Sequence, residues 1–87
     1  MIYLISYDLH RPVQEYEALI SDIKKLGPCI KPLKSQWFAQ TNLTAFQIYE
    51  SLKKHLDSDD RIFINELTSN RYGFLDTAVW DWFAGKN

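Results

Sequence analysis

The chain opens with a run of apolar residues and continues with apolar positions at helical spacing. Residues 2–7, Ile-Tyr-Leu-Ile-Ser-Tyr, are apolar on both faces, which is typical of a strand in the middle of a sheet. Pro12 suits the first turn of a helix, and apolar residues then recur every three or four positions, at Val13, Tyr16, Ile20 and Ile23. Gly27-Pro28 ends this predicted helix.

The next two segments predict an antiparallel hairpin. Residues 29–31 form a short strand that Pro32 interrupts, and because proline cannot donate to a strand ladder, this strand belongs at a sheet edge. Residues 35–40 follow too closely for any connection other than a hairpin turn.

A second helix and a further strand follow. Thr44 and Gln47 have the spacing of a capping box, and the helix runs to about His55. Its predicted apolar stripe consists of Phe46, Tyr49, Leu52 and Leu56. Residues 61–67 alternate as a strand with Ile62 and Ile64 facing inward.

The remaining residues predict an extension of the domain. Residues 72–75 suit a short extra strand, and Asp76 or Thr77 caps a last helix that carries several aromatic side chains. The element order predicts one α+β domain over residues 1–87, of ferredoxin-like βαββαβ topology, with both long helices on one face of an antiparallel sheet. Its core spans residues 1–67, and a strand and helix extend it over residues 68–87.

Composition changes this picture in three ways. The hydrophobic fraction of 46% and aromatic fraction of 15% exceed what a small core hides, which favours a partner surface and a homodimer. The net charge of -1 gives no general attraction to nucleic acid, so nucleic-acid binding requires a local basic patch. The single cysteine, Cys29, cannot form an internal disulfide, and with no apolar run of membrane length and no basic leader, we expect a cytoplasmic protein and no membrane partner.

Asp8 is the leading candidate for chemistry. It follows the most buried predicted strand, and a carboxylate held at a strand end suits a metal ligand or a general base. The alternative is an aspartate that accepts backbone N–H groups in the next turn. His10 could share a face with Asp8, but a zinc site needs a third ligand that the sequence does not offer, whereas Mg²⁺ needs only one or two carboxylates with water and phosphate.

Lysines near the predicted edge strand offer a basic rim. Lys31 and Lys34, with Arg11, could bind phosphate beside Asp8; equally, lysines on an edge strand discourage edge-to-edge pairing. The acidic run at residues 57–60 lacks the spacing of a calcium loop. Trp80 and Trp82 are two residues apart and cannot share one helix face, so one is expected in the core and the other at a partner surface.

Three segments resemble the CRISPR-associated Cas-two family and its stand-alone SinR-like relatives, with VapD-type toxins more distant. Residues 2–9 resemble the family's first strand, which ends in a Tyr-Asp pair, here Tyr7-Asp8. Residues 34–38 are similar to its Ser-Val-Phe segment, and residues 59–64 to its fourth strand, entered from an acidic loop. The resemblance spans about residues 1–67 in the family's order.

The resemblance implies a homodimer in which two Asp8 carboxylates face each other and hold Mg²⁺ or Mn²⁺ for cleavage of RNA or double-stranded DNA. Here Asp8 is the expected catalytic and metal-binding residue, and Arg11, Lys31 and Lys34 are expected to contact nucleic acid. The expected dimer interface consists of Tyr72, Phe74 and Trp80. The single arginine after Asp8 and the tryptophan-rich tail depart from the family and point to its stand-alone group.

Two other functions stay open from the sequence. One is a non-catalytic nucleic-acid-binding or scaffolding dimer. The other is a small interaction or regulatory module that uses its tail as an anchor for a protein partner, because tryptophans are enriched at interface hot spots.

Overall fold

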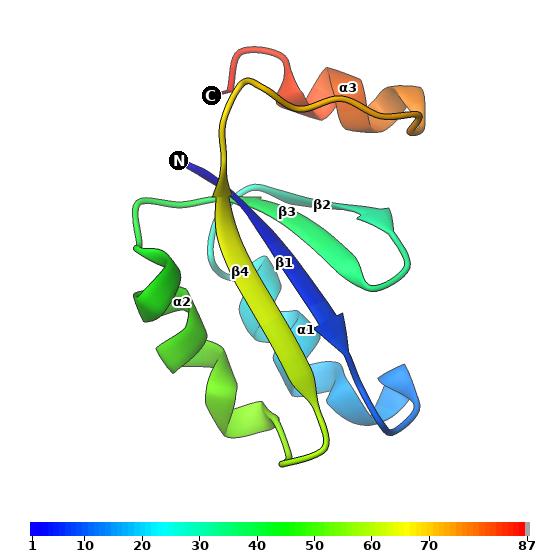
Figure 1. Ribbon diagram of the computed structural model, residues 1–87, viewed down its shortest axis with the longest axis vertical. Helices are drawn as coiled ribbons and strands as arrows, with labels where there is room; N and C mark the ends of the chain where they lie inside the picture. Colours follow the sequence, from blue (N-terminus) through cyan, green and yellow to red (C-terminus); the bar gives the residue numbers. More distant parts are fainter. Residues whose placement is uncertain (87) are drawn as a thin grey trace.

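The centre of the fold is a four-strand antiparallel sheet, seen in a computed structural model that describes residues 1–86 (Figure 1). The strands are β1 (Ile2–Asp8), β2 (Cys29–Leu33), β3 (Gln36–Gln40) and β4 (Arg61–Leu67). Their order across the sheet is β2-β3-β1-β4, with β1 between β3 and β4. The predicted central position of β1 and edge position of β2 are both confirmed. The register of β2 shifts between Ile30 and Leu33, around Pro32.

Two helical segments cover one face of this sheet. The first begins as a 3-10 turn, η1 (Val13–Tyr16), and continues as α1 (Glu17–Lys24); the second is α2 (Ala45–Leu52), followed by η2 (Lys53–His55). The predicted capping box is present: the Thr44 hydroxyl accepts from the Gln47 backbone N–H at 3.1 Å, and the Gln47 side chain accepts from the Thr44 N–H at 2.9 Å.

The core between sheet and helices corrects two predicted helix faces. Val13, at the start of the 3-10 turn, is exposed, and α1 buries Leu19 together with the predicted Ile23. In α2, Ile48 and Leu52 are buried at i,i+4 spacing, whereas Phe46 is 69% exposed. The inward orientation of Ile62 and Ile64 is confirmed. The fully or nearly buried members of this core are Tyr3, Ile5, Tyr7, Tyr16, Leu19, Ile23, Trp37, Ala39, Ile48 and Leu52.

The third helix, α3 (Thr77–Phe83), packs on the opposite face of the sheet. Val79 and Phe83 contact Ile2, whose side chain points away from α1 and α2. Figure 1 shows α3 lying across one end of the sheet, close to the start of β1. The remainder of that face carries no helix within residues 1–86.

The predicted strand at residues 72–75 is wrong. This segment is an irregular connection, and in the described part of the chain no strand edge pairs with it. Tyr72 and Phe74 are almost completely exposed, at 98% and 102%. Asn87, the last residue of the predicted extension, lies outside the described residues. None of the helices in residues 1–86 combines the length and apolar character that crossing a membrane requires.

Candidate phosphate and metal site

Asp8 lies at the carboxyl end of the central strand, beside an open cavity of about 350 Å³. It is exposed, and neither a hydrogen bond nor an ion pair engages its side chain within the described residues. The residues that line this cavity, called here the Asp8 cavity, are Tyr7, Asp8, Leu9, Arg11, Val13, Lys31, Lys34 and Ser35. The structure therefore places the proposed metal ligand and all three proposed phosphate-binding cations around one space.

The charge of the Asp8 cavity is positive although the chain carries a net charge of -1. Lys31 and Lys34 are exposed, and within residues 1–86 neither forms an ion pair. Two uncompensated ammonium groups beside a single carboxylate attract anions such as phosphate.

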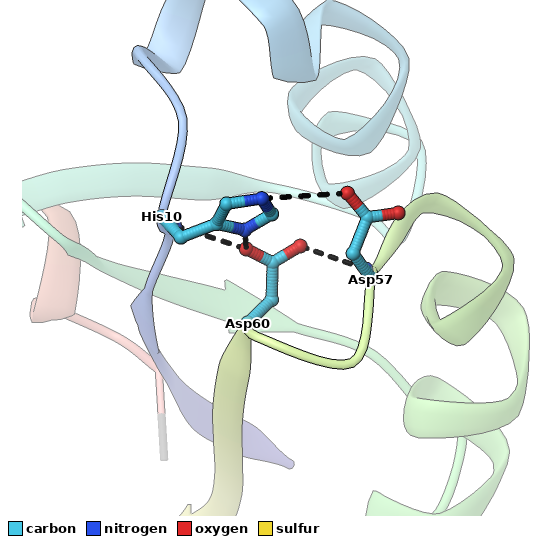
Figure 2. Close-up of side chains that lie close together, drawn as sticks. All are labelled: His10, Asp57 and Asp60. Atoms are coloured by element: carbon cyan, nitrogen blue, oxygen red, sulfur yellow. Dashed lines mark hydrogen bonds and ion pairs between the residues drawn. The ribbon is translucent and has the colours of Figure 1, made fainter.

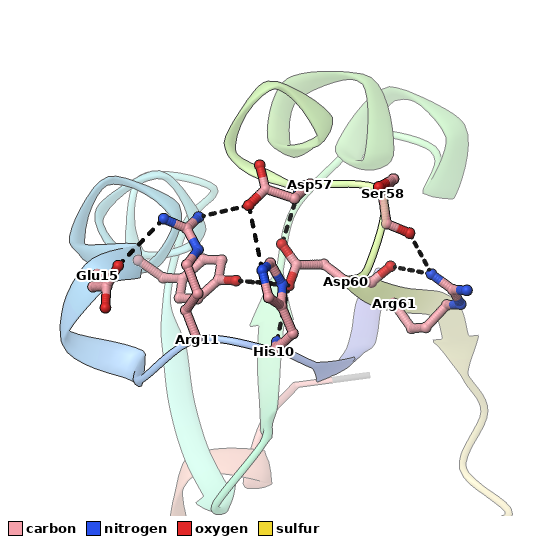
Figure 3. A network of polar contacts seen from close by, with 8 residues as sticks. His10, Arg11, Glu15, Asp57, Ser58, Asp60 and Arg61 are labelled. Carbon is pink, nitrogen blue, oxygen red and sulfur yellow. Dashed lines mark hydrogen bonds and ion pairs between the residues drawn. The ribbon is translucent and has the colours of Figure 1, made fainter.

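Arg11 is less free than the two lysines. Its guanidinium lies 3.2 Å from Asp57 and 3.4 Å from Glu15, and it stacks over the Tyr16 ring at 4.7 Å. Its Nε is buried and has no hydrogen-bond partner among the described residues. Arg11 therefore contributes to the wall of the Asp8 cavity while being held by the neighbouring network shown in Figure 3.

A second carboxylate, Asp60, lies at the same end of the sheet. Both of its oxygens accept hydrogen bonds. One of its oxygens, Oδ1, accepts from the Tyr16 hydroxyl at 2.6 Å and from the His10 backbone N–H at 3.0 Å, and lies 2.8 Å from the His10 Nδ1. The other, Oδ2, accepts from the Asp57 N–H at 2.8 Å. Figures 2 and 3 show His10 and Asp57 beside Asp60. We call Asp60 with its partners His10, Tyr16 and Asp57 the Asp60 clamp.

The environment of Asp60 favours its ionised form. Burial alone would raise the pKa of this carboxyl, but the hydrogen bonds from the Asp57 backbone, the Tyr16 hydroxyl and His10 outweigh burial and hold the pKa well below its usual range. The clamp joins the loop after β1, the start of the first helix and the loop before β4. Its evident role is to fix the loop that carries Arg11.

The Asp60 clamp also has the composition of a metal site. His10, Asp57 and Asp60 place ligand atoms within 4.8 Å of one another (Figure 2). However, the Asp60 oxygens and the His10 Nδ1 already bond to protein groups, and the Asp57 Oδ2, which lies 3.7 Å from the His10 Nε2, also lies 3.2 Å from the Arg11 guanidinium. Fewer ligands remain than a protein zinc site uses, so the cluster is better explained as a structural clamp.

The fit of a divalent cation to Asp8 is different. One chain supplies a single free carboxylate there, and its neighbours in the cavity are cations, which repel a metal ion. Mg²⁺ is commonly held by one or two carboxylates together with water and phosphate oxygens. Asp8 therefore fits a magnesium site only together with a bound phosphate or a second carboxylate.

The three tryptophans do not line the Asp8 cavity. Trp37 is buried in the main core, where its indole N–H donates to the Tyr7 hydroxyl at 3.2 Å. Trp80 and Trp82 both pack against Phe83 and both are half-buried, so contact of one of them with a partner chain stays a prediction. Trp80 also contacts the ring of Tyr72 at 5.7 Å.

Both histidines bond to carboxylates. His55 lies 2.6 Å from Asp22 and connects the end of the second helix to α1. His10 belongs to the Asp60 clamp. This role of Asp60 was not predicted from the sequence, although the antiparallel pairing of the first and last core strands indicates that their adjoining loops meet.

No protein-family model matches the chain, and no solved structure matches it significantly. The function is therefore inferred from the residues of the site.

Proposed function

We propose that this protein is a Cas-two-like dimer of ferredoxin-like topology that binds the phosphodiester backbone of nucleic acid in the Asp8 cavity and cleaves it with a divalent cation. The element order and the strand order β2-β3-β1-β4 support the topology. The resemblance of residues 1–67 to the Cas-two family supports the reaction.

One observation carries the proposal more than any other. Asp8 is exposed at the tip of the central strand, and Lys31 and Lys34 line the same cavity without partners of their own within the described residues. A carboxylate held on a rigid strand can bind a divalent cation, and the free cations beside it can bind negatively charged oxygens. A phosphodiester that is cleaved with the help of a metal ion suits both groups.

The roles of the residues follow from their charges. Lys31 and Lys34 would hold phosphate oxygens, and Asp8, with its counterpart in a second copy, would hold Mg²⁺ or Mn²⁺. A divalent cation at such a site activates water and neutralises charge on the phosphate. The Asp60 clamp would keep Arg11 beside the bound phosphate.

A cleavage assay tests the proposal. Purified wild-type protein, Asp8→Ala and Asp59→Ala are incubated with RNA and with duplex DNA, in Mg²⁺, Mn²⁺ or a chelator. Asp59 is an exposed acid that does not line the Asp8 cavity, so its variant is the matched control. We expect metal-dependent cleavage that falls about 100-fold or more in Asp8→Ala and is unchanged in Asp59→Ala. Equal cleavage by all three proteins would indicate a contaminating nuclease and contradict the proposal.

Dimerisation needs its own measurement because the proposed metal site requires two copies. Tyr72 and Phe74 are the most exposed large apolar side chains of the described residues. Sedimentation should give a dimer at micromolar concentration, and Tyr72→Ala with Phe74→Ala should weaken it. A wild-type monomer would remove the shared site.

A second function, non-catalytic binding or scaffolding of nucleic acid, is favoured by the excess of cations over carboxylates in the Asp8 cavity. It predicts a salt-dependent gel shift without cleavage, weakened by Lys31→Ala and Lys34→Ala.

A third function, capture of a protein partner by the tail, is favoured by the exposure of Tyr72 and Phe74. The double variant Tyr72→Ala with Phe74→Ala should abolish this capture.

A further inference from the structure

We propose that Lys24, at the end of α1, is a further phosphate-binding residue, so that a nucleic-acid backbone bound in the Asp8 cavity continues along β2 to α1. This inference rests on the proposed function, and it adds the path of the substrate: a polynucleotide whose phosphates meet Lys34, Lys31 and Lys24 in turn. We call these three lysines the basic stripe.

Trp37 holds Lys24 beside the Asp8 cavity. The Lys24 ammonium lies over the Trp37 ring, 5.8 Å from the ring centre. The indole N–H of Trp37 donates to the Tyr7 hydroxyl at 3.2 Å, and Tyr7 lines the cavity. Burial raises the pKa of the Cys29 thiol, and the charge of Lys24 opposes this rise, which places Lys24 near the start of β2 as well.

The pairing of β2 with β3 brings Lys31 to the same tryptophan. Between the residue pairs 30–38 and 33–36, two residues of β2 oppose one residue of β3, as in a β-bulge. The two are Lys31 and Pro32, and the one is Trp37. Lys31, which lines the Asp8 cavity, and Lys24 are therefore both neighbours of Trp37.

The charge of Lys24 is not compensated by a carboxylate. Within residues 1–86 Lys24 forms no ion pair, and the residues three and four positions before it on α1 are uncharged. Lys25, the next residue, differs because its ammonium lies 3.7 Å from Asp22. Of these two adjacent lysines, Lys24 is the one that is free to bind an anion.

Two simpler explanations do not account for the position of Lys24. Lysines on an edge strand discourage pairing between sheets, but Lys24 lies on a helix. A cation near a helix C-terminus stabilises the helix dipole, but Lys25 is just as close to that end of α1. Neither explanation requires Lys24 to lie over Trp37, next to the edge of the sheet that carries the other two lysines.

The length of the basic stripe fits a polynucleotide better than a small phosphate ester. From Cys29 to Lys34 the chain advances about 17 Å, at about 3.3 Å per residue. One strand of a duplex advances about 3.4 Å per nucleotide, so the stripe matches about five nucleotides. A small phosphate ester occupies the Asp8 cavity alone, whereas a longer backbone reaches Lys24 as well.

Lys25 provides a matched control, because it has the same charge, lies at the same end of α1 and is already paired. Binding of a labelled single-stranded RNA and a labelled duplex DNA, both longer than the basic stripe, is measured by anisotropy at several salt concentrations. The proteins are wild type, Lys24→Gln, Lys24→Arg, Lys25→Gln and Lys31→Gln. A chelating buffer prevents cleavage.

We expect Lys24→Gln to weaken binding about three- to tenfold at low salt. It should also reduce the slope of log K against log salt by about 0.7–0.9, which is the contribution of one phosphate contact. Lys24→Arg should keep the wild-type affinity and slope, and Lys25→Gln should match wild type. The RNA and DNA arms identify which form of nucleic acid follows the basic stripe.

Three outcomes would overturn the inference. Equal losses in Lys24→Gln and Lys25→Gln would mean that binding responds only to net charge. A loss of affinity in Lys24→Gln with an unchanged salt slope would mean that Lys24 only packs on Trp37. Equally tight binding of polyglutamate, with the same dependence on Lys24, would assign the basic stripe to an acidic protein.

The two proposals fail differently. If Lys31→Gln weakens binding and Lys24→Gln does not, the Asp8 cavity keeps its phosphate and only the path along β2 is contradicted. Unchanged cleavage in Asp8→Ala contradicts the nuclease and leaves the path in place. Wild type that binds neither nucleic acid contradicts both proposals.

Discussion

Two aspartates at one end of the sheet, Asp8 and Asp60, differ in almost every physical respect. Asp8 ends β1, is exposed, and makes no side-chain hydrogen bond or ion pair with the described residues. Asp60 directly precedes β4, is 6% exposed, and bonds to the Tyr16 hydroxyl, to His10 and to the Asp57 backbone. Both are close in space because β1 and β4 are antiparallel, with Asp8 paired to Arg61.

The difference separates a carboxylate that maintains the fold from one that is available to a ligand. A buried carboxylate with several donors is stable only while all of those donors stay in place, so it fixes the loops that supply them. An exposed carboxylate on a rigid strand keeps its lone pairs for a metal ion or a proton. We therefore expect substitutions of Asp60 to act on stability first, and those of Asp8 on chemistry.

The largest effect on stability is expected for Asp60→Ala. The substitution leaves the Tyr16 hydroxyl and the backbone N–H groups of His10 and Asp57 without an acceptor in a buried setting. We expect the midpoint of thermal unfolding to fall by about 10 °C or more, measured by circular dichroism.

The control for Asp60→Ala is Asp59→Ala. Asp59 is the preceding residue in the same loop but is exposed. Its removal should change the midpoint by no more than about 3 °C. Similar losses in both variants would show that the loop, and not the buried carboxylate, determines stability.

A smaller effect is expected from acid. The hydrogen bonds that outweigh burial hold the pKa of Asp60 below that of an unfolded aspartate, which is about 3.9. Ionised Asp60 therefore stabilises the fold fully above that value, and this contribution is lost as the pH falls through about 4 toward the lower pKa of the folded state. Urea unfolding of wild type should show a decline in stability below about pH 4 that is shallower in Asp60→Asn.

Asp22 contributes to the same acid response. Its hydrogen bond to His55 lowers the pKa of this carboxyl, so its stabilising contribution is also lost on acidification. Because Asp22 lies on α1 and is not part of the Asp60 clamp, Asp22→Asn removes the contribution of Asp22 to the acid response and leaves that of Asp60. An acid response in Asp60→Asn identical to that of wild type would assign the whole effect to other carboxylates.

The sequence predicted the elements that depend on local signals. The apolar run of β1, Pro32 in an edge strand and the capping box of Thr44 and Gln47 are all properties of neighbouring residues, and all are confirmed. The buried helix faces were predicted less well: Val13 is exposed at the start of the 3-10 turn, and α2 buries the face of Ile48 and Leu52 and leaves Phe46 exposed.

The candidate site divides in the same way. Asp8 was recognisable because it directly follows an apolar strand, and the cavity places it with Lys31 and Lys34 as expected. Asp60 was not, because its partners His10 and Tyr16 are 50 and 44 residues away along the chain.

The smallest effect on stability is expected for Asp8→Ala. With no hydrogen bond or ion pair to described residues, the carboxylate gains only weak attraction from exposed Lys31 and Lys34, and such surface attractions contribute about 0–1 kcal/mol. We expect the midpoint of thermal unfolding to change by no more than about 3 °C, with the same circular-dichroism spectrum as wild type. Addition of Mg²⁺ together with a short RNA should raise the midpoint of wild type more than that of Asp8→Ala, because a ligand that binds only the folded state stabilises it. A fall of 10 °C in the unfolding midpoint of Asp8→Ala would show that Asp8, like Asp60, is a structural carboxylate. The Asp8 cavity would then offer only its cations to a ligand.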